Sequence, residues 1–213
     1  IGKRITKFVY NKSDLVLTPS KSMKNYLKTH GVTKRVEVMS NGIDNSMFKQ
    51  KTDYSIKKRI IYTGRLGFEK DVDKLIEAFY IAQKTKPELR LDIWGDGPAR
   101  KSLQVLVNKL GIGKKVCFKG FYDINKVAHK ISEYDFFITA SLIETQGIVL
   151  LEAMSSGLPV VAVDKFAVKE VVLNGKNGYL SKPGDVDGLA KNILKMYANE
   201  DKLKEFGLNS IKM

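Results

Sequence analysis

The sequence predicts an α/β protein built around a doubly wound, Rossmann-like parallel sheet. Short apolar runs alternate with amphipathic helical stretches along most of the 213 residues, and this alternation is typical of βαβ units. Between residues 59 and 213 the alternation repeats about five times, which is enough for one doubly wound domain.

The expected strands are short apolar runs, many of them rich in β-branched or aromatic residues. They lie at Leu15–Thr18, Arg35–Met39, Arg59–Thr63, Leu89–Trp94, Lys115–Lys119, Phe136–Thr139 and Pro159–Val163. The expected helices carry apolar residues at helical spacing. They lie at Ser20–Thr29, Val72–Lys84, Ala99–Leu110, Ile124–Ser132, Gly147–Ser156, Val168–Leu173, Asp187–Ala198 and Asp201–Leu208.

The pattern indicates two parts joined by a linker. Residues 1–43 hold the end of a helix, two strands and one helix, which is too little to enclose a core. The polar stretch 44–58 is the expected linker, and residues 59–213 form the main domain. The chain starts without methionine and in the middle of a pattern, so we expect a fragment of a longer protein.

The chain is basic, with a formal net charge of +14 and an isoelectric point near 9.6. Its lysines occur along the whole chain, and no aromatic RNA-binding motif, zinc-finger spacing or helix-turn-helix pattern accompanies them. We therefore expect no nucleic-acid partner. General solvation and contact with an anionic membrane surface both remain open as reasons for the charge.

Several further features set limits on the kind of protein. No apolar run approaches the roughly 18–20 residues that cross a bilayer. The single Cys117 lies between two apolar residues and is interpreted as a strand core residue. A single cysteine cannot form a disulfide within the chain, which fits a reducing compartment. His30 and His129 are expected on the surface, and no cluster has metal-ligand spacing, so we expect no metal site.

Two carboxylates, Glu144 and Glu152, stand eight positions apart around the start of an apolar helix. A carboxylate in such a helix is costly unless it is hydrogen-bonded, so Glu152 is expected at the mouth of a pocket. The backbone N–H groups of Gly147, Ile148 and Val149 would lie between the two acids, where a phosphate fits. Taken alone, a solvated loop acid and a helix-surface acid remain open for Glu144 and Glu152.

A second group of candidate residues follows the expected strand at 59–63. Gly64 permits a tight turn, Arg65 is placed at the carboxyl edge of the sheet, and Lys70 precedes a helix whose N-cap is expected at Asp71. Ligands of open α/β sheets bind at this edge, and a diphosphate suits an arginine fork and a lysine point charge. Taken alone, solvated surface cations are the other interpretation.

Two turns complete the pattern. Trp94-Gly95-Asp96-Gly97-Pro98 is expected to connect a strand to a helix, with Pro98 at the first helical position. Asn41-Gly42-Ile43-Asp44 is also a turn, and both an ordinary turn and a ligand role for Asn41 or Asp44 remain open.

Together, the Gly-Arg-x-x-x-x-Lys spacing, the pair Glu144 and Glu152, and the Asn-Gly-Ile-Asp turn resemble the GT4 family of retaining, GT-B-fold glycosyltransferases. The resemblance covers essentially the whole chain. It implies a C-terminal donor-binding domain preceded by a remnant of the N-terminal acceptor domain. Lys169-Glu170 departs from the family, which often has Gly and Pro just before the acidic residue, so a phosphate role for the loop 166–169 stays open.

The resemblance also implies roles for individual residues. Arg65 and Lys70 would grip the diphosphate and steady the leaving group, Glu144 would orient the sugar, and Glu152 would hold the ribose. The strand end at Phe118 and Lys119 would read the nucleobase, partly through backbone groups. The donor-binding residues implied are Gly64, Arg65, Lys70, Phe118, Lys119, Glu144, Gly147, Ile148, Val149 and Glu152, and the catalytic ones are Arg65, Lys70 and Glu144.

The implied reaction is transfer of a hexose, with retention and without a metal or other cofactor, from a nucleotide-diphospho-sugar such as a UDP-hexose. The acceptor would be a lipid or a cell-surface glycan, and Glu144-Thr-Gln-Gly147 resembles members that glucosylate membrane diacylglycerol. We expect a cytoplasmic protein, with the inner face of the membrane as an alternative location, and a fragment that transfers little sugar unaided. The competing interpretations are a non-catalytic nucleotide-binding or scaffold module, a sugar-nucleotide epimerase and a basic nucleic-acid-binding protein.

Overall fold

In the computed structural model, the main feature is a six-stranded sheet whose neighbouring strands run parallel. The structure describes residues 2–121 and 123–213. The strands are β3 (Arg59–Thr63), β4 (Arg90–Trp94), β5 (Val116–Gly120), β6 (Phe136–Ile138), β7 (Val160–Val163) and β8 (Gly178–Ser181). Their order, β5-β4-β3-β6-β7-β8, reverses direction between β3 and β6. This is a doubly wound sheet, so the predicted fold class is confirmed.

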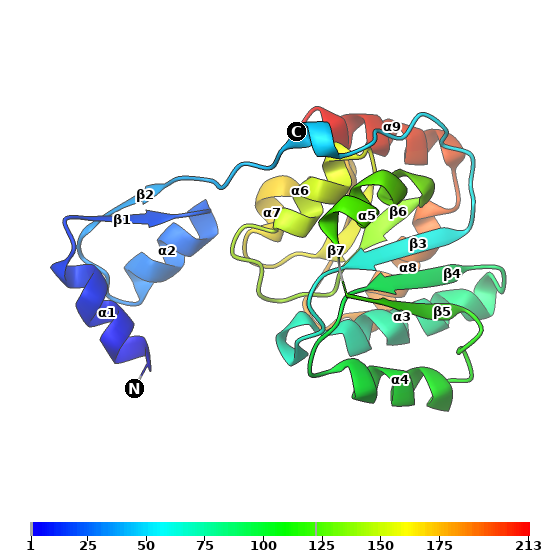
Figure 1. The fold of residues 1–213 in the computed structure, drawn as a ribbon, viewed down its shortest axis with the longest axis horizontal. Helices are drawn as coiled ribbons and strands as arrows, with labels where there is room; N and C mark the ends of the chain where they lie inside the picture. Colours follow the sequence, from blue (N-terminus) through cyan, green and yellow to red (C-terminus); the bar gives the residue numbers. More distant parts are fainter. Residues whose placement is uncertain (1, 122) are drawn as a thin grey trace.

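Helices cover both faces of this sheet (Figure 1). One apolar layer joins the sheet to α3 (Val72–Thr85), α4 (Arg100–Lys109), α8 (Val186–Met196) and α9 (Glu200–Ile211). The other joins it to α5 (Ile124–Lys130), α6 (Ile148–Ser155) and α7 (Val168–Val171). Within the described part of the chain, no helix is long and apolar enough to cross a bilayer.

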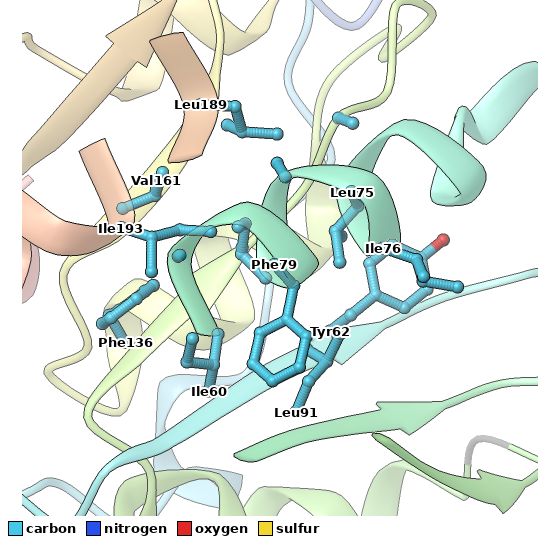
Figure 2. Close-up of a cluster of buried hydrophobic side chains, with 14 of the residues drawn as sticks. Ile60, Tyr62, Leu75, Ile76, Phe79, Leu91, Phe136, Val161, Leu189 and Ile193 are labelled. Carbon is cyan, nitrogen blue, oxygen red and sulfur yellow. The ribbon is translucent and has the colours of Figure 1, made fainter. Parts of the chain in front are cut away.

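Strand β3 is central because its side chains alternate between the two apolar layers. Ile60 and Tyr62 pack in the α3 layer, whereas Ile61 packs in the α6 layer. Figure 2 shows the ring of Phe79, from α3, in the same cluster as Ile60 and Leu91. Phe79 is fully buried, and burying one such side chain contributes about 1.5–3 kcal/mol.

A smaller unit lies beside the main domain (Figure 1). It consists of α1 (Gly2–Lys12), β1 (Leu15–Thr18), α2 (Lys21–Thr29) and β2 (Arg35–Val38), with β1 and β2 paired in parallel. Its apolar cluster is small, and Leu15 and Leu17 on β1 are about half exposed. The helix α1 was expected only as a helix end, whereas the structure gives it eleven residues.

The edges of the main sheet differ from the sequence-based expectation. Strand β8 was not predicted, because Gly178 opens a four-residue edge strand that carries little apolar pattern. Cys117 was expected in the core and this was wrong, since its side chain is exposed. It lies on β5, the opposite edge strand, where Val116 points into the packed layer and Cys117 to the other face.

Of two predicted helix starts, one needs correction and the other is confirmed in position. Pro98 was expected at the first helical position, but α4 begins at Arg100 and Pro98 precedes the N-cap residue Ala99. Asp71 does occupy the N-cap position of α3, yet its side chain caps no N–H group. Asp71 has a left-handed backbone with φ 47, which ends the preceding 3-10 turn and differs from the extended backbone usual at an N-cap.

Helix α6, predicted over residues 147–156, is held between two glycines in left-handed conformation. Gly147 is the N-cap, with φ 80, and Gly157 follows the helix, with φ 77. At the C-terminal end, Gly157 N–H donates to Met154 and Leu158 N–H donates to Ala153, which is a Schellman motif. Both ends of this apolar helix are therefore fixed in direction, and its N-terminus faces the carboxyl edge of the sheet.

The segment 44–58 packs along the main domain although its composition is polar. Every third residue, at Phe48, Lys51 and Tyr54, is buried. Lys51 Nζ donates to the carbonyl oxygens of Ser132 (3.3 Å) and Tyr134 (2.7 Å). Burial lowers the pKa of Lys51 to about 8, although the nearby Asp135 carboxylate acts in the opposite direction.

We predict that Gly157→Ala destabilises the protein more than Gly111→Ala. Gly111 ends α4 in the same Schellman geometry with φ 70, and a Cβ there would meet no atom within 4 Å. A Cβ at Gly157 would lie 2.8 Å from Tyr54 Oη and 3.1 Å from Ile211 Cδ1. Urea denaturation should show a loss of about 1–2 kcal/mol for Gly111→Ala and about 1–3 kcal/mol more for Gly157→Ala. Equal losses would contradict the packing argument.

We also predict a pH effect from Lys51. Between about pH 8 and 10.4 the unfolded chain keeps the Lys51 proton that the folded protein has released, so the free energy of unfolding gains a term that rises with pH. The free energy of unfolding of the unmodified protein, minus that of Lys51→Met, should therefore rise by about 1–2 kcal/mol from pH 8 to pH 10. Lys49→Met removes an exposed lysine and serves as the control. If this difference in the free energy of unfolding stays constant or falls with pH, Lys51 does not release its proton on folding.

Candidate functional site

The candidate site is a cavity of about 260 Å³ at the carboxyl ends of β3 and β6. These two strands flank the point where the strand order reverses, which is where ligands of doubly wound sheets bind. Its lining comes from the end of β3, the turn that follows, the loop before α6, the first turn of α6 and the crossing segment after β2. The lining residues are Asn41, Tyr62, Thr63, Gly64, Arg65, Lys70, Thr139, Glu144, Thr145, Gln146, Gly147, Ile148 and Val149.

The cavity brings together seven of the ten candidate donor-binding residues from the sequence. These are Gly64, Arg65, Lys70, Glu144, Gly147, Ile148 and Val149. The other three do not line it. Phe118 is half-buried on β5 in the α3 layer, and Lys119 on the same strand is exposed, with its Nζ 3.6 Å from Asp92 Oδ2. Glu152 is buried one turn into α6.

Lys70 and Glu144 both line the cavity and form an ion pair there. Lys70 Nζ lies 2.7 Å from Glu144 Oε1 and also donates to the Ile143 carbonyl oxygen at 3.4 Å. Glu144 is 8% exposed, so its charge is only weakly screened by water. The two opposite charges offset each other, and both residues line the cavity, where they can contact a polar ligand.

Arg65 is held differently. Its guanidinium pairs with Glu69 in the next turn, and the side chain is 65% exposed. Its backbone is fixed, because Tyr62 Oη donates to the Arg65 carbonyl oxygen at 3.1 Å. Burial, together with the charges of Glu144 and Glu69, raises the pKa of Tyr62 well above its ordinary value, so Tyr62 stays a neutral hydroxyl. Arg65 is thus an exposed cation on a backbone that a hydrogen bond holds in place.

The N-terminus of α6 forms the floor of the cavity. Within the described residues, the backbone N–H groups of Gly147, Ile148 and Val149 donate to no protein atom. Three unpaired N–H groups at the positive end of a helix dipole favour an anion. Only glycine suits position 147, because the backbone there has a positive φ. A Cβ at this position would also lie 2.8 Å from Leu150 Cδ1.

Gln146 is a site residue that sequence reasoning missed. It is 6% exposed, and its amide bonds the crossing segment at Ser40 and Asn41. The partners are 105 and 106 positions away in the sequence, so no local pattern could identify them. The same contacts bring Asn41 into the cavity lining, whereas Asp44 caps the short 3-10 turn η1 (Asn45–Met47).

This arrangement suits a ligand with both an anionic and a hydroxyl-rich part. The exposed cation and the free N–H groups suit a polyphosphate, and the carboxylate accepts hydrogen bonds from hydroxyls. In the described part of the chain, no group of three or more His, Cys, Asp or Glu residues could hold a metal ion. His30 and His129 are exposed and lie outside the cavity lining, as the sequence predicts.

We predict strong coupling between Lys70 and Glu144. Removing Lys70 alone leaves a buried carboxylate without its cation, whereas removing both charges does not. A double-mutant cycle with Lys70→Met and Glu144→Gln, measured by urea denaturation, should give a coupling energy of about 1–3 kcal/mol. The control cycle uses Arg65→Met and Glu69→Gln, an exposed i,i+4 pair expected to couple by less than about 1 kcal/mol. Similar coupling in both cycles would show that burial does not strengthen the first pair.

Comparison with known proteins gives the same picture at the level of family and fold. The family described as glycosyl transferases group 1 matches residues 44–213, and glycosyltransferase family 4 matches residues 1–46. The sulfoquinovosyl transferase SQD2 of Arabidopsis thaliana is 31% identical, over 86% of this chain and 38% of the relative. The GtfA subunit of the UDP-N-acetylglucosamine–peptide N-acetylglucosaminyltransferase of Streptococcus parasanguinis is 35% identical, over 69% of this chain and 28% of the relative.

A solved structure shows the same fold. The crystal structure of Anabaena HepE in complex with UDP and glucose aligns with a TM-score of 0.88 and 23% identity, over 99% of this chain and 61% of HepE. The chain thus spans less than two thirds of the length of each of these three proteins. Because the family match covers most of the sequence and the sheet is doubly wound as predicted, the chain belongs to the group 1 glycosyl transferases.

Proposed function

We propose that this chain is the donor-binding part of a glycosyltransferase that moves a hexose from a nucleotide-diphospho-sugar without a metal ion. One observation carries the proposal. A single cavity at the switch point joins the ion pair of partly buried Lys70 and buried Glu144 to a helix N-terminus whose N–H groups have no partner among the described residues. A sugar diphosphate has the matching parts, because its hydroxyls suit the carboxylate and its phosphates suit the cations and the N–H groups.

The proposed division of labour follows from the chemistry of each group. Arg65 and the N–H groups of Gly147, Ile148 and Val149 hold the diphosphate, and Lys70 neutralises the charge that grows on it as the sugar leaves. Glu144 accepts hydrogen bonds from the sugar hydroxyls. The neutral Tyr62 supports the Arg65 backbone and takes no proton from the acceptor.

Three residues of the proposed donor site lie outside the cavity. Glu152 for the ribose, and Phe118 and Lys119 for the nucleobase, enter the proposal through the resemblance to the GT4 family. UDP is the proposed nucleotide, supported by the name of the Streptococcus parasanguinis relative. Retention of the anomeric configuration likewise enters through the family resemblance.

The acceptor is proposed to be a lipid or a cell-surface glycan. The stretch Glu144-Thr-Gln-Gly147 resembles glycosyltransferases that glucosylate membrane diacylglycerol, which supports the lipid. A net charge of +14 would favour an anionic membrane surface. The proposed location is therefore the cytoplasm, at the inner face of the membrane.

The deciding experiment is calorimetric titration of the chain with UDP-glucose, GDP-mannose, UDP and GDP in the absence of metal. We expect binding of the UDP pair. Arg65→Ala should weaken it about tenfold or more, because a charge-assisted contact to phosphate is lost. Arg90→Ala, which removes an exposed arginine at the opposite edge of the sheet, should leave binding unchanged.

Two outcomes would count against the proposal. Absence of binding by all four ligands would remove the donor-site assignment. Equal affinity of the unmodified protein and Arg65→Ala would show that the diphosphate is held elsewhere. In the full-length enzyme, undiminished transfer by Glu144→Ala would instead point to a non-catalytic nucleotide-binding module or a different sugar contact.

A further inference from the structure

The amide of Gln146 makes four hydrogen bonds in a buried position. Its Oε1 accepts from Asn41 N (3.1 Å) and Asn41 Nδ2 (2.8 Å), and its Nε2 donates to Ser40 Oγ (3.1 Å) and Asn41 O (2.6 Å). Both donors and both lone pairs of the amide are therefore used. A buried amide that is satisfied in this way fixes its partners in place, because any shift would leave a polar atom unpaired.

The crossing segment 40–43 depends on this amide. Before it, Met39 N donates to Thr18 O, and after it, Asp44 caps η1. Between these points, every hydrogen bond from the segment to the rest of the described chain goes to Gln146. Asn41 is exposed and precedes a glycine, so nothing else in its surroundings would hold it against the cavity.

The four hydrogen bonds of the Gln146 amide also determine which atom of Asn41 is available to bind a ligand. One N–H of Asn41 Nδ2 donates to Gln146 Oε1, and within the described structure Oδ1 makes no hydrogen bond. An amide oxygen repels a phosphate but accepts a hydrogen bond from a hydroxyl. Asn41 therefore complements Glu144 in the cavity, while Arg65 and the α6 N-terminus suit the phosphates.

We propose that Gln146 is a positioning residue that fixes Asn41 so that its Oδ1 accepts a hydrogen bond from a hydroxyl of the donor sugar. This inference rests on the proposed function. It assigns to the segment that joins the two units a direct part in sugar recognition. It also explains why a polar side chain is buried immediately before the helix that binds the diphosphate.

The test compares UDP-glucose with UDP by calorimetry on five forms of the chain. These are the unmodified protein, Asn41→Ala, Gln146→Ala, the double variant, and Gln83→Ala as the control. Gln83 is a partly buried glutamine on α3 whose amide bonds only the Pro87 carbonyl oxygen. Because Asn41 is exposed, Asn41→Ala leaves the packed core intact and keeps the test valid if Gln146→Ala folds poorly.

We expect Asn41→Ala and Gln146→Ala each to weaken UDP-glucose binding about fivefold, the loss of one neutral hydrogen bond, and UDP binding by less than about twofold. The double variant should bind UDP-glucose no more weakly than Asn41→Ala, because Gln146 acts through Asn41. Gln83→Ala should match the unmodified protein. A purely structural role for Gln146 would weaken both ligands together and would add to the effect of Asn41→Ala.

The outcomes separate this inference from the function on which it rests. If the unmodified protein binds neither ligand, the proposed donor fails and this inference fails with it. If it binds UDP-glucose but Asn41→Ala and Gln146→Ala bind it equally well, only the role of Gln146 and Asn41 is wrong. Equal weakening of UDP and UDP-glucose would likewise overturn the assignment to the sugar.

Discussion

The rest of the structure depends on the reversal of strand order between β3 and β6. Because parallel strands joined by right-handed crossovers must place their helices on one face or the other, the chain changes face at this point. Helices α3 and α4 follow strands on one side of the reversal, and α6 and α7 follow strands on the other. The loops therefore diverge at the carboxyl ends of β3 and β6, and the cavity lies where they part.

The chemistry of that cavity is produced by contrasts between neighbouring groups. Helix α6 is apolar on almost every side, yet its N-terminus offers N–H groups that have no partner among the described residues, because the first turn of a helix has no preceding carbonyl groups to bond. Next to it, Lys70 and Glu144 bring opposite charges into a place of low exposure, where each stabilises the other. A ligand that carries both phosphate and hydroxyl groups can replace these internal contacts with contacts of its own.

The two units are connected by polar contacts as well as by the chain itself. Gln146 holds the crossing segment, and Glu170 of α7 accepts hydrogen bonds from the backbone N–H groups of Lys21 (3.0 Å) and Ser22 (2.6 Å) at the start of α2. Ser22 Oγ also donates to the Phe166 carbonyl oxygen at 3.0 Å. Glu170 thus caps a helix of the smaller unit, and these hydrogen bonds hold its pKa below the ordinary value despite partial burial.

Much of this protein was determined by local sequence. The alternation of apolar runs and helical patterns predicted the parallel sheet, and the apolar pattern over 147–156 predicted α6 to within one residue at each end, because periodicity is a local property. Arg65, Lys70 and Glu144 could be placed together because each follows or precedes a strand end on the same edge. Non-local packing decided the rest. The exposure of Cys117 depends on which strand lies at the edge of the sheet. The burial of Lys51 depends on carbonyl groups more than 80 positions away. The hydrogen bonds of Gln146 to Asn41 join residues 105 positions apart. No short pattern encodes such contacts, because their partners meet only when the sheet has formed.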